Sequence, residues 1–212
     1  MILINELEKI IVDHNVNVVY DIGAYKGDFS RKVYNIKPQA IIYAFEANTI
    51  HLRPKWSKNV ETIEWFNTAL SNTIEERKFY SLGTTGDSLY METYNGKHSE
   101  SKTKTVTTDT LNNFINTNKL LLPEFLKIDV QGSELDILSE TDLSKCIAIH
   151  CETPVEGIVY NQGAPTRDQY FSFFEQHGFV HNKKVKDLDV GTRENRTVVQ
   201  QDYIFSKVEL DD

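Results

Sequence analysis

The sequence predicts an α/β fold whose mostly parallel sheet is covered by helices on both faces and ends in an antiparallel C-terminal hairpin. Three observations support this prediction. Apolar segments of strand length alternate with helix-like segments along most of the chain. Those apolar segments lack the alternation of a half-exposed strand, so each strand should be buried on both faces. The last part of the chain instead carries two strand-like segments in succession.

The first elements follow from two kinds of pattern. Apolar residues at helical spacing begin the chain, and the Val-rich segment VNVVYDIG then predicts a buried strand that stops at Gly23. The segment AIIYAFEA predicts a second buried strand. In chain order, we expect a helix over residues 3–13, a strand over 16–23, a helix over 26–35, a strand over 40–47 and a short helix from Asn48.

The later elements continue the alternation. ERKFYSL and KTKTVTT alternate in the strand manner, and Thr108 or Asp109 is expected to cap the next helix. The polar segment KDLDVGTRENR should connect the last two strands. We expect strands over 62–70, 76–82 and 102–108, a helix over 109–117, a strand over 124–129, a helix over 133–140, a strand over 145–151, a helix over 166–177, and strands over 179–185 and 198–206.

Length and charge limit the organisation and the partners. A chain of 212 residues should form one domain, residues 1–212, with the long polar segment 83–102 as a mobile loop or lid. The net charge of −8 argues against nonspecific binding to nucleic acid or anionic lipid. Charged residues such as Glu6 and Lys9 interrupt the first apolar pattern, so we expect neither a signal peptide nor a membrane span.

The two cysteines indicate a reducing compartment. Cys146 and Cys151 lie five residues apart in one expected strand, where alternation turns their side chains to different sides. A disulfide between them is therefore not expected, and no CxxC metal spacing occurs in the sequence. A cytoplasmic location is the default prediction, and no metal site is predicted.

Ionisable side chains gather at the expected strand ends. In a parallel sheet the ligand crevice lies at the carboxyl ends of the strands, near the point where the strand order reverses. A random rim would not be expected to collect so many groups that can ionise. The polar residues at these ends are Asp21, Glu46, Thr68, Asp129, His150 and Glu152.

The first turn, DIGAYKG, distinguishes between two kinds of nucleotide ligand. Gly23 and Gly27 permit a sharp turn, and Glu46 follows where an acid commonly binds ribose hydroxyls. Tyr25 breaks the GxGxxG pattern of dinucleotide folds. Asp21 at this turn would repel a pyrophosphate by roughly 4 kcal/mol at 4 Å and an intermediate dielectric. It would instead attract S-adenosylmethionine, whose ammonium and sulfonium groups flank a ribose. The alternative is that Asp21 only caps a helix and Glu46 is a solvated strand end.

At this point the chain resembles the FkbM-like family of S-adenosylmethionine-dependent methyltransferases. The resemblance runs from Val18 to about Val180 and rests on short segments in the family's order. It implies a three-layer, Rossmann-like class I methyltransferase fold with seven strands, and O-methylation of a sugar or polyketide hydroxyl. The segments are VVYDIGAYKGDFS, IIYAFEANTIHL, NTALSN, GDSLY, VTTDTLNNFI, FLKIDVQGSELDIL and IHCET.

The resemblance also implies a set of cofactor contacts. Glu46 would hold the ribose with Ala47 beside it, Thr68 and Ala69 would line the adenine region, and Asp129 would lie near the transferred methyl group. Matching GDSLY makes Ser88 a cofactor or lid contact. The loop on the methionine side would comprise Asp21, Gly23, Ala24, Tyr25 and Gly27.

Four positions depart from the family's usual residues. Ala47 replaces proline, Tyr25 replaces a small polar residue, and Gln131 and Ser133 replace glutamate and alanine. Gln131 removes a carboxylate beside the expected active centre. That change leaves cofactor binding expected and puts metal-dependent chemistry in doubt.

The candidate catalytic residues are Asp129, His150 and Glu152. Transfer to a hydroxyl requires a positioned acceptor, exclusion of water and a group that accepts a proton. His150 and Glu152 are two residues apart and should project to the same side of a strand. Glu134 is a further acid, but Ser133 and Asp136 around it resemble a helix-capping box. Tyr160, Asn161 and Arg167 are candidate acceptor contacts.

The expected activity is therefore transfer of a methyl group to a hydroxyl of a sugar-like or small natural-product acceptor. Two alternatives stay open. One is a protein of the same fold that binds the cofactor or serves as a scaffold without catalysis, which Gln131 and Ser133 motivate. The other is a nicotinamide-dependent oxidoreductase on a related sheet.

Overall fold

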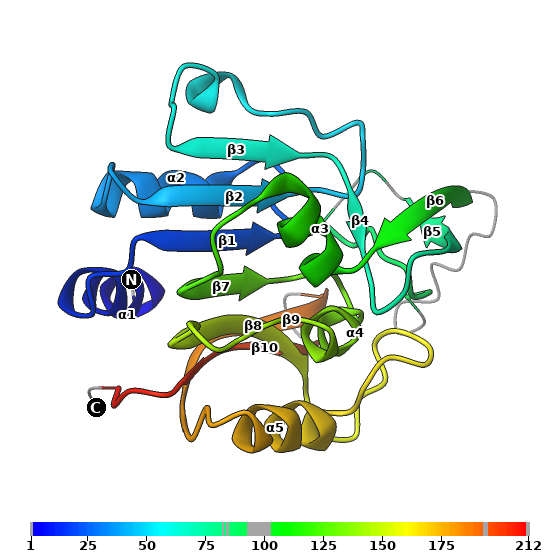
Figure 1. Ribbon diagram of the computed structural model, residues 1–212. Helices are drawn as coiled ribbons and strands as arrows, with labels where there is room; N and C mark the ends of the chain where they lie inside the picture. The colour runs from blue at the N-terminus through cyan, green and yellow to red at the C-terminus, as the bar shows by residue number, and fades with distance from the viewer. Residues whose placement is uncertain (1, 82, 84, 93–102, 193–194, 211–212) are drawn as a thin grey trace.

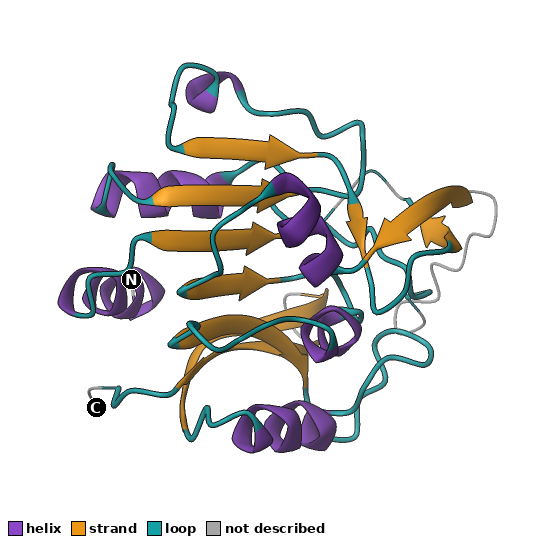
Figure 2. Cartoon of the chain, in the orientation of Figure 1, coloured by secondary structure: helices purple, strands orange, loops and turns teal. Residues whose placement is uncertain are grey.

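The computed structural model describes residues 2–81, 83, 85–92, 103–192 and 195–210 (Figure 1). Helices and strands alternate through most of the chain, and a long hairpin ends it (Figure 2). The elements are α1 (Ile2–Asp13), β1 (Val18–Ile22), α2 (Asp28–Ile36), β2 (Ile41–Phe45), the 3₁₀ turn η1 (Lys55–Ser57), β3 (Ile63–Phe66), β4 (Ala69–Leu70), β5 (Glu76–Tyr80), β6 (Thr103–Asp109), α3 (Leu111–Asn118), β7 (Phe125–Ile128), α4 (Glu134–Ser139), β8 (Ala148–Pro154), α5 (Arg167–Gln176), β9 (His181–Thr192) and β10 (Asn195–Ser206).

The main sheet has seven strands in the order β3-β2-β1-β7-β8-β10-β9. The strands from β3 to β8 run parallel, whereas β10 pairs antiparallel with both β8 and β9. The order reverses between β1 and β7, so the ends of these two strands meet at the middle of the sheet edge. This arrangement confirms the predicted α/β class with its antiparallel C-terminal hairpin.

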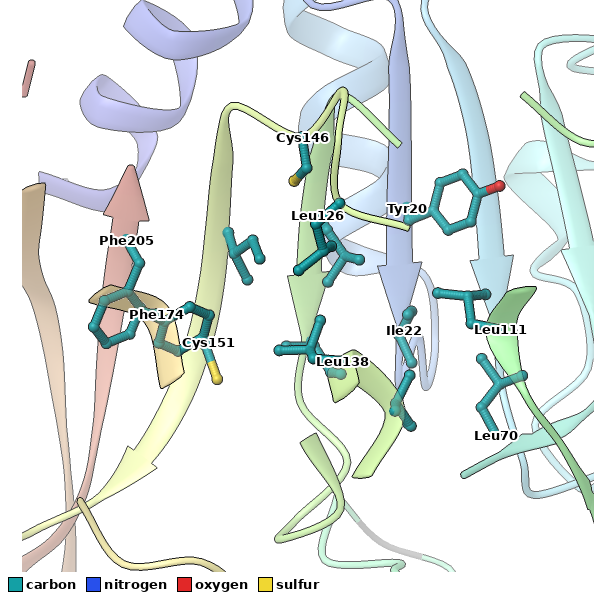
Figure 3. Packing of buried hydrophobic residues seen from close by; sticks show 14 of the residues in the cluster. Tyr20, Ile22, Leu70, Leu111, Leu126, Leu138, Cys146, Cys151, Phe174 and Phe205 are labelled. Carbon is teal, nitrogen blue, oxygen red and sulfur yellow. The ribbon is translucent and has the colours of Figure 1, made fainter. Parts of the chain in front are cut away.

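Two apolar cores fill the space between the sheet and its helices. On one face, Leu111 of α3, Leu138 of α4 and Phe174 of α5 belong to one core, which also contains Tyr20, Leu126 and Phe205 (Figure 3). On the other face, residues of α1 and α2 pack against Val19, Ile42, Phe125 and Ile204. The Phe174 and Phe205 rings are stacked with centroids 3.9 Å apart, which joins α5 to the hairpin. Both faces of the central strands are thus buried, as their continuous apolar sequences predict.

The predicted strand over 62–70 is divided in the structure. Ile63–Phe66 pairs with β2 in the main sheet, whereas Ala69–Leu70 pairs with β6 in a second sheet of order β4-β6-β5. Asn67 lies at the break, and its side-chain amide donates to the carbonyls of Glu46 at 3.3 Å and His51 at 3.2 Å. These contacts turn the chain out of the main sheet and carry β4 beyond the end of β2.

The short helix predicted from Asn48 is absent from the described residues there, and only the 3₁₀ turn Lys55–Ser57 follows. The Asn48 side chain accepts a hydrogen bond from the Ile50 amide at 3.3 Å, which competes with a helical start. Pro54 further disfavours helical backbone at the residue before it.

Two other expectations are corrected at element ends. Thr110, and not Thr108 or Asp109, caps α3 by accepting the Asn113 amide at 3.2 Å. The strands β9 and β10 extend into KDLDVGTRENR, which was predicted to be a polar connection. Their pairing with each other supplies the backbone hydrogen bonds that local sequence patterns do not reveal.

The two cysteines form no disulfide, as predicted, although only one of them lies within the strand. Cys146 precedes β8 and Cys151 lies within it, and both are buried and free of a disulfide.

Within the described ranges, no helix has the length and apolar character needed to cross a bilayer.

Candidate functional site

A cavity at the carboxyl ends of β1, β2 and β7 encloses about 670 Å³, part of it open to solvent. Its wall includes many of the residues predicted from the sequence as cofactor contacts: Gly23, Tyr25, Glu46, Ala47, Thr68, Ala69, Ser88 and Asp129. The other three predicted contacts, Asp21, Ala24 and Gly27, do not line it. We call this space the main cavity.

The first turn brings the backbone close to the β7 end. Gly23 has a positive φ of 76°, and an added Cβ there would lie 1.9 Å from the carbonyl oxygen of Asp129. The Gly23 and Ala24 amides both donate to the Phe45 carbonyl, at 3.0 and 2.9 Å. Gly23 is therefore required for packing as well as for conformation, because no side chain fits between the two strand ends.

Glu46 projects into the main cavity from a fixed position. Its carboxylate accepts hydrogen bonds from the backbone amides of Tyr25 and Asn48, each at 2.7 Å. Burial raises the pKa of Glu46, while those two amides act in the opposite direction. The acid is thus held on the wall, with its side chain oriented by backbone donors.

The described part of the predicted lid closes one side of the main cavity. The Asn48 side-chain amide donates to Ser81 and Asp87, and the Asp87 carboxylate also accepts from the Gly83 amide at 2.9 Å. Ser88 donates its hydroxyl to the Gln131 carbonyl at 2.7 Å. Residues 84 and 93–102 of the predicted lid lie outside the described residues. These contacts join Ser81 and Asp87 to the chain after β2, and Ser88 to the chain after β7.

The remaining wall is largely apolar. Sequence reasoning did not select these residues as site residues, because each lies in an ordinary apolar pattern. The apolar side chains of the wall are Ile22, Phe45, Leu70, Phe79, Leu89, Val130 and Ile137. A flat, weakly polar ring such as adenine suits such a surface.

Charge in the main cavity has one sign. Glu46, Asp87 and Asp129 line it, whereas no Lys, Arg or His belongs to the described part of its wall. A pyrophosphate would be repelled by these acids, whereas a cationic nucleoside would be favoured. The discrimination expected from the sequence therefore has a physical basis, although Asp21 is not the residue that supplies it.

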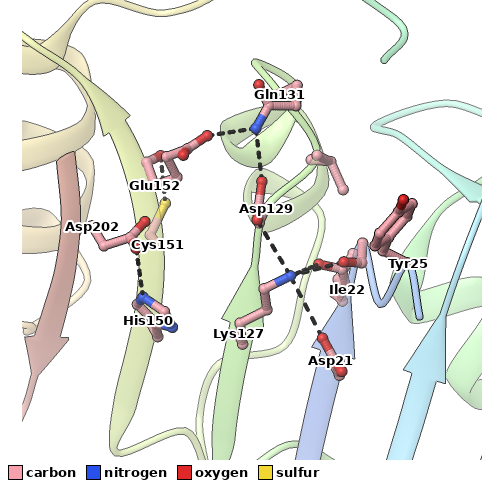
Figure 4. Close-up of polar contacts among 12 residues, drawn as sticks. Asp21, Ile22, Tyr25, Lys127, Asp129, Gln131, His150, Cys151, Glu152 and Asp202 are labelled. Carbon is pink, nitrogen blue, oxygen red and sulfur yellow. Dashed lines mark hydrogen bonds and ion pairs between the residues drawn. The ribbon is translucent and has the colours of Figure 1, made fainter. Parts of the chain in front are cut away.

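Asp21 lies behind the cavity wall and is fully buried. One of its oxygens accepts from the Ser30 amide at 3.1 Å and from the Ser30 hydroxyl at 2.6 Å. Its other oxygen lies 3.6 Å from the Lys127 ammonium (Figure 4). Asp21 thus joins the start of α2 to β7, which is close to the helix-capping alternative considered for it.

Lys127 was missed by the sequence analysis and connects two walls of the site. Its ammonium donates to the Gly23 carbonyl at 2.8 Å and lies 3.6 Å from carboxylate oxygens of both Asp21 and Asp129 (Figure 4). Burial alone would lower the pKa of Lys127, but the surrounding carboxylates outweigh it and raise the pKa above its usual value. A lysine within an apolar strand segment, two residues before an acid, was the available signal.

Gln131 occupies the position where the sequence departs from its family. Its side-chain amide nitrogen donates to Asp129 at 2.8 Å and to Glu152 at 2.5 Å, so it lies between two carboxylates (Figure 4). Gln200 of β10 donates to the same Glu152 oxygen at 2.8 Å. Burial, and then the nearby acids Asp129 and Asp202 among others, raise the pKa of Glu152 well above its usual value.

His150 and Glu152 share a side of β8, as expected, but they lie in different surroundings. His150 is buried, with its ring 6.0 Å from that of Phe29 and its Nε2 atom 3.8 Å from an Asp202 oxygen. It does not line the main cavity, and it does not line a second, smaller cavity whose wall includes Glu152. The structure therefore brings Asp129 and Glu152 together and leaves His150 deeper in the sheet.

Glu134 organises the loop after β7. Its carboxylate accepts from the amides of Val130 at 3.0 Å and Gly132 at 2.9 Å, and from the Tyr170 hydroxyl at 2.5 Å. The predicted capping box around it does not form, because Ser133 makes no side-chain cap bond. Asp136 instead accepts from the Tyr90 hydroxyl at 2.9 Å.

The acids do not form a recognisable metal centre. Across the part of the chain that the structure describes, no group of three or more His, Cys, Asp and Glu side chains is arranged to hold a metal ion.

Comparisons with known proteins agree on one family and one fold. The model of the Methyltransferase FkbM domain matches residues 21–181. A search of curated proteins found no significant match. Among solved structures, the N-terminal domain of EvdMO1, in the presence of SAH and D-fucose, matches 96% of this chain and 82% of its own at 9% identity, with a TM-score of 0.51. That likeness shows the fold alone, which is the class I methyltransferase fold.

Two further solved structures share less with the chain. The methyltransferase FkbM from Methylobacillus flagellatus KT is 14% identical, and the match covers 66% of this chain and 33% of that one, with a TM-score of 0.45. The precorrin-6y C5,15-methyltransferase from Geobacter metallireducens GS-15 is 15% identical over 91% of this chain and 81% of its own, with a TM-score of 0.48.

Replacing Lys127 with methionine should destabilise the protein by about 3–5 kcal/mol, because Asp21 and Asp129 lose their shared counter-charge. The difference should be present at neutral pH and shrink as the pH rises through the raised pKa of Lys127, since the wild-type ammonium then loses its proton. Urea unfolding measures it, with Lys145→Met on the exposed surface as the control. A loss below about 1 kcal/mol would contradict this role.

Replacing Gln131 with glutamate should place a third carboxyl group between Asp129 and Glu152. The introduced group would have a raised pKa in the folded protein, so its stabilising, neutral form is lost as the pH rises. The variant should therefore unfold near the wild-type temperature in acid and progressively earlier toward neutral pH. Thermal unfolding between about pH 4 and pH 8 tests this, with the exposed Gln162→Glu as the control. A difference in unfolding temperature that stays constant across that range would contradict the placement of residue 131 between the two carboxyl groups.

Proposed function

Because the chain belongs to the FkbM family of S-adenosylmethionine-dependent methyltransferases, we propose that it methylates a hydroxyl group of a sugar-like or small natural-product acceptor. The observation that carries this proposal is the main cavity, where Glu46, Asp87 and Asp129 lie beside an apolar wall and the Gly23 turn. We further propose that residues 1–212 act as one methyltransferase domain.

The cavity wall fits the chemistry of S-adenosylmethionine. Glu46 offers carboxylate oxygens to ribose hydroxyls, and Phe45, Leu70 and Leu89 offer an apolar surface to adenine. Asp129 offers a negative charge near the turn of Gly23, where the cationic end of the cofactor would be stabilised. When bound, S-adenosylmethionine supplies a methyl group that is already activated by the positive charge on sulfur.

The protein's own contribution is to position the acceptor and to receive its proton. We propose that Asp129 accepts that proton, because its side chain is 39% exposed, lines the main cavity and is held from behind by Lys127. Gln131 fixes one Asp129 oxygen at 2.8 Å, so the carboxylate keeps one orientation. Glu152 is the acid on the other side of Gln131, and we propose that it lies near the acceptor. We propose no contact between His150 and the acceptor, because His150 lines neither cavity.

The alternatives are less well supported. The acids of the main cavity disfavour a nicotinamide cofactor, whose pyrophosphate would lie against them. A cofactor-binding protein without catalysis was motivated by Gln131, yet Asp129 and its supporting contacts are retained. The EvdMO1 domain in the presence of SAH and D-fucose makes hexoses a reasonable first panel of acceptors.

The cofactor proposal predicts that S-adenosylhomocysteine binds and that Glu46→Ala weakens this binding by roughly 10- to 100-fold. The reason is that hydrogen bonds to a charged carboxylate contribute roughly 1.5–3 kcal/mol. Calorimetry measures both proteins, with Glu64→Ala on the exposed side of β3 as the matched control. Wild-type affinity should also fall as the pH drops through the raised pKa of Glu46, because the neutral acid accepts ribose hydroxyls less well. No binding at millimolar ligand would refute the proposal.

The catalytic proposal predicts that Asp129→Asn lowers methyl transfer much more than it lowers affinity for S-adenosylhomocysteine. A missing general base typically costs 10²–10⁴-fold in rate. Release of S-adenosylhomocysteine from a panel of hydroxylated acceptors measures transfer. Full activity of Asp129→Asn on an acceptor that the wild type methylates would rule out this role.

A further inference from the structure

A second cavity lies on the other side of the loop that follows β7. It encloses about 390 Å³, partly open to solvent, and we call it the second cavity. Its polar wall is formed by Glu134, Glu152, Tyr160, Asn161, Thr166 and Gln200. Its volume is near the lower end for small-molecule sites, about 300–1,000 Å³, which suits a single ring better than a long chain.

The loop that follows β7 contributes residues to both cavities. Asp129, Val130 and Ser133 line the main cavity, whereas Gly132 and Glu134 line the second. At Gly132, φ is +111° and an added Cβ would lie 2.9 Å from the Cβ of Ala164, so the loop and the opposite wall are in close contact. Successive residues of this loop therefore line the two cavities in turn.

Gln131 links the chemistry of the two sides. Its amide nitrogen donates to Asp129, in the main cavity, and to Glu152, in the second. Its carbonyl accepts from Ser88 on one side and from Asn161 on the other. The proposed base and the second cavity are thus connected through a single side chain (Figure 4).

The second cavity provides hydrogen-bonding groups without positive charge. In the described part of its wall there is no Lys, Arg or His. Burial raises the pKa of Glu152 well above its usual value. Neither form of this acid stabilises an anion, because the ionised form repels it and the neutral form brings no positive charge. Pro154, Ile158 and Pro165 add apolar surface that suits the C–H face of a sugar ring.

Gln200 supplies an independent indication of a ligand. It is buried, and its Nε2 atom donates to Glu152 at 2.8 Å. Its Oε1 atom is buried with no hydrogen-bond partner among the described residues. A buried acceptor without a donor is costly, and a hydroxyl group of a bound molecule would satisfy it. The carboxyl group of Glu152 beside it could bind a second hydroxyl.

We infer that the second cavity is the acceptor subsite and takes an uncharged, hydroxyl-bearing molecule about the size of a monosaccharide. This inference rests on the proposed function and names the class of substrate for it. The acceptor hydroxyl would lie near the Asp129–Gln131–Glu152 contact, at the boundary of the two cavities. Anionic acceptors such as sugar phosphates are disfavoured, because the described part of the wall offers acids and no positive charge.

Saturation-transfer NMR on the protein with S-adenosylhomocysteine tests this inference, with methyl β-D-glucopyranoside and glucose 6-phosphate as probes at millimolar concentration. The neutral glycoside should receive saturation and the phosphate should not. Gln200→Met should reduce the glycoside signal roughly fivefold or more, because its polar contacts are lost. Gln162→Met, at an exposed position, is the matched control.

A second variant adds charge without disturbing the buried groups. Val159 lies in the wall of the second cavity and is 62% exposed, so Val159→Lys places an ammonium group at the rim. Glucose 6-phosphate should then bind, while affinity for S-adenosylhomocysteine stays unchanged.

The two proposals fail in different ways. Absence of S-adenosylhomocysteine binding by calorimetry would refute the proposed function. Normal S-adenosylhomocysteine binding with no glycoside signal, or with equal signals from both probes, would overturn the inference alone. An unchanged glycoside signal in a folded Gln200→Met protein would also overturn it.

Discussion

The buried ammonium group of Lys127 is the interaction on which the arrangement of the site depends. It donates to the Gly23 carbonyl and lies 3.6 Å from both Asp21 and Asp129. Since Asp21 in turn holds Ser30 of α2, one cation connects the first turn, the first covering helix and the proposed base. Without Lys127, the buried Asp21 would lack its counter-charge, and an unpaired buried charge is costly. The two strand ends that form the cavity are thus held by charge as well as by sheet pairing.

A second level of organisation centres on the backbone of Gln131, which has a positive φ of 59°. Its carbonyl accepts hydrogen bonds from Ser88 and Asn161, so segments from two distant parts of the chain meet at one oxygen. Glu134 and Tyr170 hold the same loop from the side of α4 and α5. The loop is therefore fixed by long-range contacts, although its own sequence has the form of an ordinary turn.

The contrast between local sequence patterns and long-range contacts explains what could be predicted from the sequence. Strand alternation and the rules of parallel sheets place Asp21, Glu46 and Asp129 at neighbouring strand ends, and the structure has them there. Partners were not predictable, because Gln200 is 69 residues from Gln131 and reaches it only through the pairing of β8 with β10. Lys127 was overlooked since it stands within an apolar segment. The helix expected from Asn48 does not form, because the Asn48 side chain accepts the Ile50 amide and Pro54 follows; its amide group also bonds to Ser81, a partner that the local sequence does not reveal.

Asp21 does not have the role that the sequence predicted for it, although other acids line the cavity. From the sequence, the charge of Asp21 argued against a pyrophosphate. In the structure this charge is offset by Lys127 and by two hydrogen bonds from Ser30, and it does not face the cavity. Glu46, Asp87 and Asp129 instead line the wall itself and would repel a pyrophosphate there. Because Lys127 lies beside both Asp21 and Asp129, the buried acid still contributes: it holds the cation that lies next to the exposed acid, so the charge of the wall depends on a set of groups and not on a single residue.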